Sequence, residues 1–244
     1  MTGTILSLRN VSKHFRGLVA INDVSIDLAA GTISSLIGPN GAGKSTLFNL
    51  ITGYLAPTTG TIHFGDLRID RMPTQRIAAL GIARAFQIAK PFPELSVLDN
   101  VRIGALFGKS GARDVARVTA EALDVTGLRE LADRPALSLT VGYLRRLELA
   151  RAIAARPELL LADEPCAGLN HTETDEIVAI LRRVRAAGVT ILLVEHDMTA
   201  VMAVSDQVFV LDAGTKIAEG SAETVKQDPR VIAAYLGDAS EDAA

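Results

Sequence analysis

The sequence has no long hydrophobic run. None of its apolar stretches approaches the roughly 18 to 20 residues that a helix needs to span a bilayer, and its start, Met1 to Thr4, shows no signal-peptide pattern. Cysteine is nearly absent as well: Cys166 is the single one, so no internal disulfide can form. These absences predict a cytoplasmic protein in which Cys166 is a small, half-buried filler.

The sequence also lacks an excess of positive charge. Its 25 Lys and Arg against 28 Asp and Glu give a net charge of -3, which argues against a nucleic-acid partner and against a polybasic membrane-surface protein. We therefore expect any membrane contact to pass through another protein. The 48% hydrophobic content of the 244 residues supplies a packed core for one large or two small domains.

One motif is prominent against this background. Residues 38–46 read Gly-Pro-Asn-Gly-Ala-Gly-Lys-Ser-Thr, which fits the phosphate-loop pattern completely. Glycines let the backbone curl so that successive N–H groups face phosphates, and a lysine adds a positive charge there. The predicted contacts are Asn40, Gly41, Ala42, Gly43, Lys44, Ser45 and Thr46, with Ser45 also able to ligate Mg²⁺.

The flanks of the loop favour this interpretation over a chance match in a Gly-rich turn. The apolar run Ile33–Ile37 predicts a buried strand before the loop, and Lys44–Thr52 predicts a helix after it. The positive end of that helix would meet the phosphates. Strand, loop and helix are the context that the motif requires.

Upstream of the loop, Ile5–Val11 and Val24–Leu28 alternate apolar and polar residues. This period predicts two strands of a half-exposed antiparallel edge. Residues 13–17 between them predict a polar loop that carries Phe15. The Phe15 ring could stack on an adenine, or it could tuck onto the sheet; the sequence leaves both open.

Downstream, Ile82–Gln87 predicts a strand whose polar last residue, Gln87, reaches into the site. From Ile88 to about Gly142 the pattern is mostly helical, with Ser96 as a cap, and predicts a helical insert. Where core and insert meet, three apolar side chains either form an exposed groove for a partner or close the core of the insert: Ile88, Phe92 and Leu95.

A second polar site follows the apolar run Leu159–Ala162. Asp163 is placed to hold Mg²⁺ opposite Ser45, and Glu164 to polarise an attacking water. His196 follows another apolar strand in the same way and could hydrogen-bond a γ-phosphate. Because carboxyl ends of parallel strands share one edge of a sheet, these side chains are expected to gather there.

The motifs and their order resemble the ATP-binding subunits of ABC transporters over nearly the whole chain. The resemblance implies an α/β phosphate-loop core with a parallel sheet, an antiparallel β edge and an inserted helical subdomain. It divides the chain into residues 1–87 and 143–236 as the two parts of the ATP-binding core, 88–142 as the helical subdomain, and 237–244 as a disordered tail. The matching positions are Gly38–Thr46 for Walker A, Leu159–Asp163 for Walker B, Glu164 for the catalytic carboxylate, Gln87 for the Q-loop, His196 for the switch histidine and Phe15 for the adenine-stacking aromatic.

At the position of the family's signature motif, residues 139–143 depart from Leu-Ser-Gly-Gly-Gln. Thr140 keeps a hydroxyl for a γ-phosphate oxygen, Gly142 keeps an N–H donor, and Tyr143 is bulkier than glutamine. The following residues, 145–152, are similar to the family's signature helix. The resemblance implies ATP and Mg²⁺ as cofactors, with Ser45, Gln87 and Asp163 at the metal and Lys44, Gln87, Glu164 and His196 in catalysis.

Several stretches resemble the importers of branched-chain amino acids within that family, namely residues 17–24, 83–87, 167–170, 194–198 and 234–237. The resemblance implies a homodimer, or a heterodimer with a second ABC ATPase, on membrane-spanning permease subunits at the inner face of the cell membrane. A periplasmic or extracellular substrate-binding protein would act indirectly. An ABC ATPase for another substrate and a catalytically weak ATP-binding regulatory module remain alternatives. A nucleotide kinase or GTPase would share only the phosphate loop.

Overall fold

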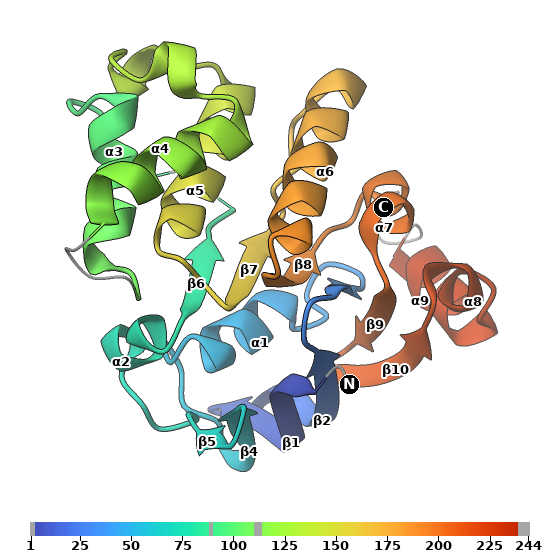
Figure 1. Cartoon of the computed structure of the whole chain (residues 1–244). Coiled ribbons are helices and arrows are strands. Elements are labelled where there is room, and N and C mark those ends of the chain that lie inside the picture. Colours follow the sequence, from blue (N-terminus) through green and yellow to red (C-terminus); the bar gives the residue numbers. More distant parts are fainter. Residues whose placement is uncertain (1–2, 88–89, 110–113, 239–244) are drawn as a thin grey trace. The chain divides into compact units, whose positions relative to one another are not determined.

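The computed structural model describes residues 3–87, 90–109 and 114–238 (Figure 1). The chain divides into two compact units: residues 1–74 with 192–244 form the first, and residues 75–191 form the second. Helix α2 (Thr74–Ala79) and strand β8 (Thr190–Val194) contain the two points at which the chain passes from one unit to the other.

The first unit contains an antiparallel sheet with the strand order β2-β1-β4-β5 (Figure 1). Alternate side chains of the two long strands, such as Leu6 and Leu8 on one and Ile26 and Leu28 on the other, are buried. This period is expected of a sheet with one covered face, and the predicted antiparallel edge is confirmed. The strands are β1 (Thr4–Phe15), β2 (Leu18–Ala29), β4 (Thr59–Phe64) and β5 (Leu67–Arg68).

The connection between β1 and β2 is shorter than the sequence predicts. Residues 13–17 are not a loop, because β1 continues through Phe15, which pairs with Leu18. Arg16 and Gly17 make the turn, with φ of 40° and 103°. Positive φ at both central positions suits the twist of a two-residue hairpin, so the polar residues before the turn belong to an exposed strand. The loop prediction was wrong.

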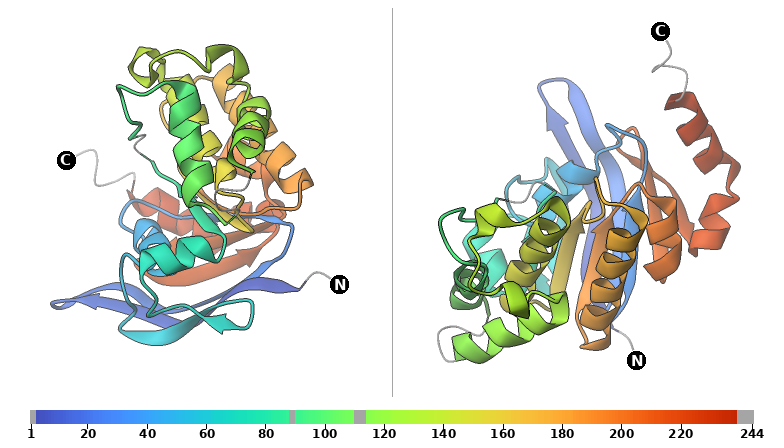
Figure 2. Two further views of the ribbon diagram at one scale, coloured as in Figure 1. Left: turned by 60° about the vertical axis from the view of Figure 1, so that its left-hand side comes forward. Right: turned by 90° about the horizontal axis from the view of Figure 1, so that it is seen from above.

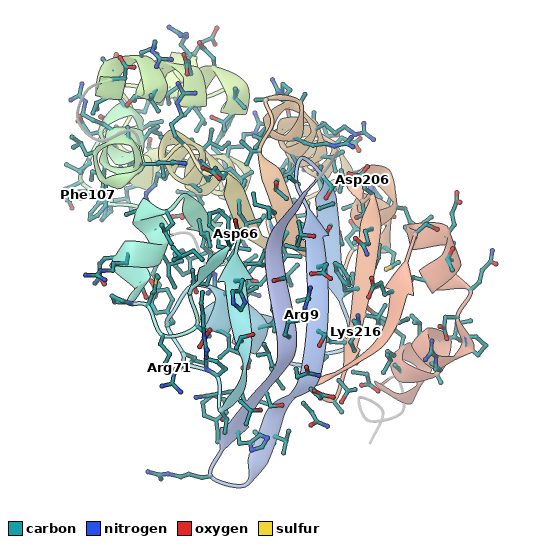
Figure 3. All side chains as sticks on the ribbon, turned by 60° about the horizontal axis from the view of Figure 1, so that its bottom comes forward. Arg9, Asp66, Arg71, Phe107, Asp206 and Lys216 are labelled. Carbon is teal, nitrogen blue, oxygen red and sulfur yellow. The ribbon has the colours of Figure 1, made fainter. Side chains whose placement is uncertain are left out.

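A parallel pair of strands leads into the phosphate loop. Strand β3 (Ile33–Ile37) pairs in parallel with β9 (Gln207–Asp212), and β10 (Thr215–Gly220) pairs antiparallel to β9. Every β3 residue is buried. Asp206, labelled in Figure 3, accepts the backbone N–H of Ile33 at 2.8 Å. This hydrogen bond therefore joins the first residue of β3 to the residue that precedes β9.

Helix α1 (Lys44–Ile51) confirms the helix predicted over Lys44–Thr52. The first unit also contains α7 (Met198–Val204), α8 (Ala222–Lys226) and α9 (Pro229–Asp238). Helix α9 extends two residues into the segment 237–244 that was expected to be a disordered tail. Residues 239–244 lie outside the described residues.

The second unit contains a helical cluster formed by α3 (Val97–Phe107), α4 (Val115–Thr126) and α5 (Val141–Ala154), with α3 and α4 in green beside α5 in the left view of Figure 2. Short 3₁₀ turns, η2 (Arg129–Leu131) and η3 (Ala136–Ser138), connect α4 to α5. The predicted cap of α3 is confirmed, because Ser96 Oγ accepts the N–H of Asp99 at 3.0 Å.

Helix α5, which carries the signature segment, packs on the helices of the insert. The sequence boundary at 142/143 falls inside this helix, and Leu147, Ala150 and Ala154 pack in the same apolar cluster as α3 and α4. Their spacing of three and four residues places them on one helix face. The signature helix thus shares the core of the helical insert.

The remaining elements of the second unit are β6 (Ile82–Ala85), β7 (Leu159–Asp163) and α6 (His171–Ala186). Strands β6 and β7 are parallel, with Arg84 opposite Leu161 and Ala85 opposite Ala162. All residues of β7 and of β8 are buried, as the continuous apolar runs predict. Strand β7 ends at Asp163, and β8 ends at Val194, two residues before His196.

The segment that enters the helical insert is held by a buried asparagine. Phe92 N–H donates to Asn100 Oδ1 at 2.8 Å, and Asn100 Nδ2 donates to the carbonyls of Phe92 at 3.0 Å and Ser96 at 2.9 Å. The Phe92 ring stays exposed, with the Arg151 guanidinium 5.4 Å from its centroid, and Leu95 is also exposed. Of the predicted groove, Phe92 and Leu95 therefore do not close the apolar core, and Ile88 lies outside the described residues.

We expect Asn100→Ala to lower the free energy of unfolding by about 2–3 kcal/mol, because it removes the hydrogen bonds that the buried Asn100 amide makes to the backbone of Phe92 and Ser96. Urea denaturation of the purified chain measures this change. Arg102→Ala, which removes an exposed ion pair with Asp99 on the same helix, should cost less than about 0.5 kcal/mol. An equal loss of unfolding free energy in the two variants would show that the Asn100 amide does not organise the segment that enters the helical insert.

Candidate nucleotide-binding and hydrolytic site

The phosphate loop packs so tightly that two of its positions exclude a side chain. A Cβ on Gly38 would lie 2.0 Å from the carbonyl oxygen of Leu211, and one on Gly43 would lie 2.6 Å from that of Ala20. Their φ values are 150° and 101°, a region that favours glycine. The loop is further closed by Ala42 N–H, which donates to Pro39 O at 3.2 Å. Its path is therefore fixed by the backbone of β2 and β9.

Lys44 is buried at the start of α1 and turns back onto the loop. Its Nζ donates to the carbonyls of Gly38 at 2.6 Å and Pro39 at 2.8 Å. An ammonium held at the mouth of a loop, beside the unpaired N–H groups of a helix N-terminus, is a site for phosphate oxygens. Ser45 and Asn40 are exposed next to it, so the Ser45 hydroxyl is accessible to a metal.

Two further candidate residues belong to the same unit. Phe15 ends β1 at the hairpin turn with a ring that is 40% exposed, and Lys13 Nζ lies 5.0 Å from the ring centroid. His196 is exposed directly after β8 and the buried Glu195, and its backbone N–H donates to Glu195 Oε2 at 3.2 Å. Asp197 then caps α7 by accepting the N–H of Thr199 at 2.8 Å. The histidine side chain is thus presented at a strand end, as the sequence predicts.

The second unit brings the other predicted catalytic residues together. Gln87 Nε2 donates to Glu164 Oε2 at 2.6 Å. Glu164 has a φ of 47°, a left-handed backbone that is rare for non-glycine residues and is often found at functional sites. Gln87 therefore holds the side chain of Glu164, but it is not the last residue of a strand as predicted, because β6 ends two residues earlier, at Ala85.

Asp163 has a partner that sequence reasoning missed. The Arg84 guanidinium forms an ion pair with its carboxylate, and the two side chains are only 9% and 5% exposed. Arg84 also lies over the Phe86 ring, 4.8 Å from its centroid. A buried carboxylate requires such a partner. The one signal in the sequence was a charged residue inside the otherwise apolar strand β6.

The signature segment lies at the N-terminus of α5. Thr140 occupies the cap position, but its hydroxyl makes no capping hydrogen bond, which leaves the first N–H groups of the helix for another acceptor. A Cβ on Gly142 would lie 2.5 Å from Glu173 Oε1. Glu173 and Asn170 form the capping box of α6. The close fit of Gly142 against this cap was not predicted.

Each unit offers one oxygen ligand of the kind that Mg²⁺ prefers, the Ser45 hydroxyl in the first unit and the Asp163 carboxylate in the second. Within residues 3–87, 90–109 and 114–238, no group of three or more His, Cys, Asp or Glu side chains could hold a metal by itself.

None of the helices in the described part of the chain is both long and apolar enough to cross a bilayer.

The glycine-rich loop, its lysine and the carboxylates that end β7 define a phosphate-loop nucleotide-binding protein of the α/β class.

Comparisons with known proteins resolve the class further. A family model described as "ABC transporter" matches residues 21–167, and one described as "Branched-chain amino acid ATP-binding cassette transporter" matches residues 215–241. The chain is 42% identical to the high-affinity branched-chain amino acid transport ATP-binding protein LivG of Escherichia coli, over 98% of this chain and 100% of that protein. It is 38% identical to the corresponding BraF protein of Pseudomonas aeruginosa, with the same coverage.

Solved structures agree. A nucleotide-free ATP-binding cassette from an ABC transporter matches with a TM-score of 0.87 and 31% identity, over 96% of this chain and 99% of that one. A cassette in its ADP conformation matches with a TM-score of 0.88 and 31% identity, over 97% and 100%. The chain belongs to the ABC transporter family as an ATP-binding subunit with ATPase activity, and the predicted fold class is confirmed.

We expect Arg84→Ala to lower the free energy of unfolding by about 3 kcal/mol, because it leaves the buried Asp163 carboxylate without its guanidinium. The measurement is urea denaturation without Mg²⁺ or nucleotide, repeated in an Asp163→Asn background. With a neutral amide at 163, the same arginine substitution should cost less than about 1 kcal/mol. An equal cost in both backgrounds would contradict a stabilising ion pair.

Proposed function

We propose that this chain is the Mg²⁺-dependent ATPase subunit that powers an importer of branched-chain or related amino acids. The observation that carries the proposal is the 42% identity to LivG across 100% of that protein, whose name states this transport. The match of residues 215–241 to a branched-chain amino acid family model supports the same substrate class.

In the first unit, the loop N–H groups and Lys44 bind the β- and γ-phosphates, and Phe15 stacks on the adenine. Phosphate oxygens would replace the Gly38 and Pro39 carbonyls as acceptors for Lys44 Nζ. Charge on the transferring phosphoryl group is then met by an ammonium that is already buried and oriented, so little reorganisation is needed at the moment of reaction. His196 donates a further hydrogen bond to the γ-phosphate.

In the second unit, Glu164 orients or deprotonates the attacking water, and Gln87 reports the state of the γ-phosphate. The 2.6 Å hydrogen bond from Gln87 to Glu164 keeps the carboxylate in place and occupies one of its oxygens. The other oxygen can accept a proton from water. Magnesium bound with ATP, held by Ser45 and Asp163 with Gln87, would supply charge neutralisation.

The chain carries one phosphate loop and one signature segment, so we propose that it works as a dimer, with itself or with a second ABC ATPase. Thr140 and Gly142 of one subunit would contact the γ-phosphate bound to the other. ATP then favours the closed dimer by its contacts at the interface, and hydrolysis removes them. Similar cassettes have been solved as dimers.

The dimer would act on membrane-spanning permease subunits from the cytoplasmic face of the cell membrane, and a periplasmic or extracellular substrate-binding protein would deliver the solute. Phe92 and Leu95, exposed near Gln87, offer apolar contacts for such a permease. We propose no nucleic-acid partner, because the net charge is -3.

One observation favours a second candidate, an ATP-binding module with weak catalysis. Tyr143 places an exposed ring in the signature segment, stacked on Arg146 at 5.0 Å from its guanidinium, and Val141 beside it is also exposed. Bulk at this position could limit closure of the dimer. Steady-state ATPase assays with and without the permease subunits separate the two functions, since a weak module stays slow in both.

We expect Glu164→Gln to lower the ATPase rate at least about 100-fold, because it removes the group that activates water, and to leave ATP affinity unchanged. A malachite-green phosphate assay and isothermal titration with ATP measure the two quantities. Glu130→Gln, at an exposed carboxylate of the same unit, is the matched control and should retain the wild-type rate. Turnover near wild type in the Glu164 variant would remove this residue from catalysis.

The substrate class is tested in proteoliposomes that contain the permease subunits and the substrate-binding protein. Leucine, isoleucine or valine should raise the ATPase rate, while lysine and glutamate should not, because the transported solute favours the closed state of the complex. Stimulation by a different solute, with none by the branched-chain amino acids, would support an ABC ATPase for another substrate.

A further inference from the structure

The C-terminal segment is the part of the chain that the site described above leaves unused. Helix α9 contains Tyr235, one of the residues by which the sequence resembles the branched-chain subgroup, and the subgroup's family model covers this segment. In the right-hand view of Figure 2, α9 appears in red near the C-terminal end of the described chain. Its position in the first unit places it in the same body as the phosphate loop.

An apolar cluster connects α9 to both nucleotide-binding segments of this unit. Ile37, the residue before Gly38, is fully buried in it, together with Val201 of α7 and Val231 of α9. Met198, two residues after His196, and Tyr235 pack against the same cluster. Because packed interiors transmit displacements, a shift at Tyr235 reaches the strand end that leads into the phosphate loop.

The Tyr235 hydroxyl has an unusual environment. Its oxygen is buried, and no residue in the described part of the chain meets it with full hydrogen-bond geometry, although the backbone N–H of Gly38 lies close enough to act on it. Burial raises the pKa of the phenol, and the nearby backbone N–H of Gly38 acts in the opposite direction. Buried hydroxyls nearly always have a partner, so one without a well-formed hydrogen bond beside a ligand-binding loop points to a contact that forms in another state.

We propose that Tyr235 is a positioning residue for the phosphate loop: its ring seats Ile37, and its hydroxyl accepts the N–H of Gly38 when the loop holds a nucleotide. The inference rests on the proposed nucleotide site. Tyr235 touches neither the nucleotide nor the reacting atoms and acts through the loop.

The loop has a reason to move when nucleotide binds. Lys44 Nζ now donates to the carbonyls of Gly38 and Pro39, and phosphate oxygens compete for the same ammonium. When these carbonyls lose Lys44, the peptide units on either side of Gly38 can adjust. Gly38 already packs closely against the carbonyl of Leu211, so little room is left for a shift toward β9, and the Tyr235 hydroxyl is the acceptor that the adjusted loop would meet. The C-terminal helix thereby favours the nucleotide-bound form.

The test is Tyr235→Phe in the full chain, which removes the hydroxyl and keeps the ring. We expect the Kd for Mg-ATP, measured by isothermal titration, to rise about 3- to 10-fold, the value of one hydrogen bond. The KM for ATP should rise in parallel while kcat is unchanged. The Tm without nucleotide should stay the same or rise, because the nucleotide-free protein gains nothing from this hydroxyl.

Tyr54→Phe, which removes the hydroxyl of an exposed tyrosine in the same unit, is the matched control and should leave the Kd for Mg-ATP unchanged. Tyr235→Ala should lower the Tm as well, because it also removes the ring from the cluster. Wild-type affinity in Tyr235→Phe, or a loss of affinity that is accompanied by an equal loss of nucleotide-free stability, would overturn the proposal. If the wild-type chain bound no ATP, the proposed function would fail instead.

Discussion

The structure depends first on a steric constraint, the close approach of the phosphate loop to two neighbouring backbones. Gly38 lies against the carbonyl of Leu211, and Gly43 lies against that of Ala20. No side chain fits at either position. The backbones of β9 and β2 therefore restrict the path of the loop, and the loop can present its N–H groups in one direction only. Strand β3 leads directly into the loop; it is buried, and a hydrogen bond to Asp206 holds its first residue.

Burial of charge is the second constraint. Asp163 ends a strand in which every residue is buried, so its carboxylate would be costly without the Arg84 guanidinium. One residue later, Glu164 is partly exposed and held by an uncharged amide, Gln87. The two adjacent carboxylates thus have different environments and suit different roles, with the first near a cation and the second near water.

The features that depend on neighbouring residues in the chain could be predicted from the sequence. The phosphate loop, the apolar strand before Asp163 and the cap at Ser96 were read from local patterns and were confirmed. Contacts between distant residues were missed: Arg84 with Asp163, Gly142 with Glu173, and Tyr235 beside Gly38. A local pattern contains no information on which remote side chain fills a space. The loop at 13–17 was misplaced for a related reason, since the pairing of strands across the hairpin decided its structure.

The central claim is that two nucleotide-binding subunits share each ATP, with the loop of one facing the signature segment of the other. The most direct measurement is an experimental structure of the chain with Mg²⁺ and a non-hydrolysable ATP analogue. The account predicts a dimer in which the γ-phosphate accepts hydrogen bonds from Lys44 and from the N–H of Gly142 of the partner subunit. A nucleotide-bound structure in which Gly142 lies far from every γ-phosphate would contradict it and would leave a nucleotide-binding protein without the shared site.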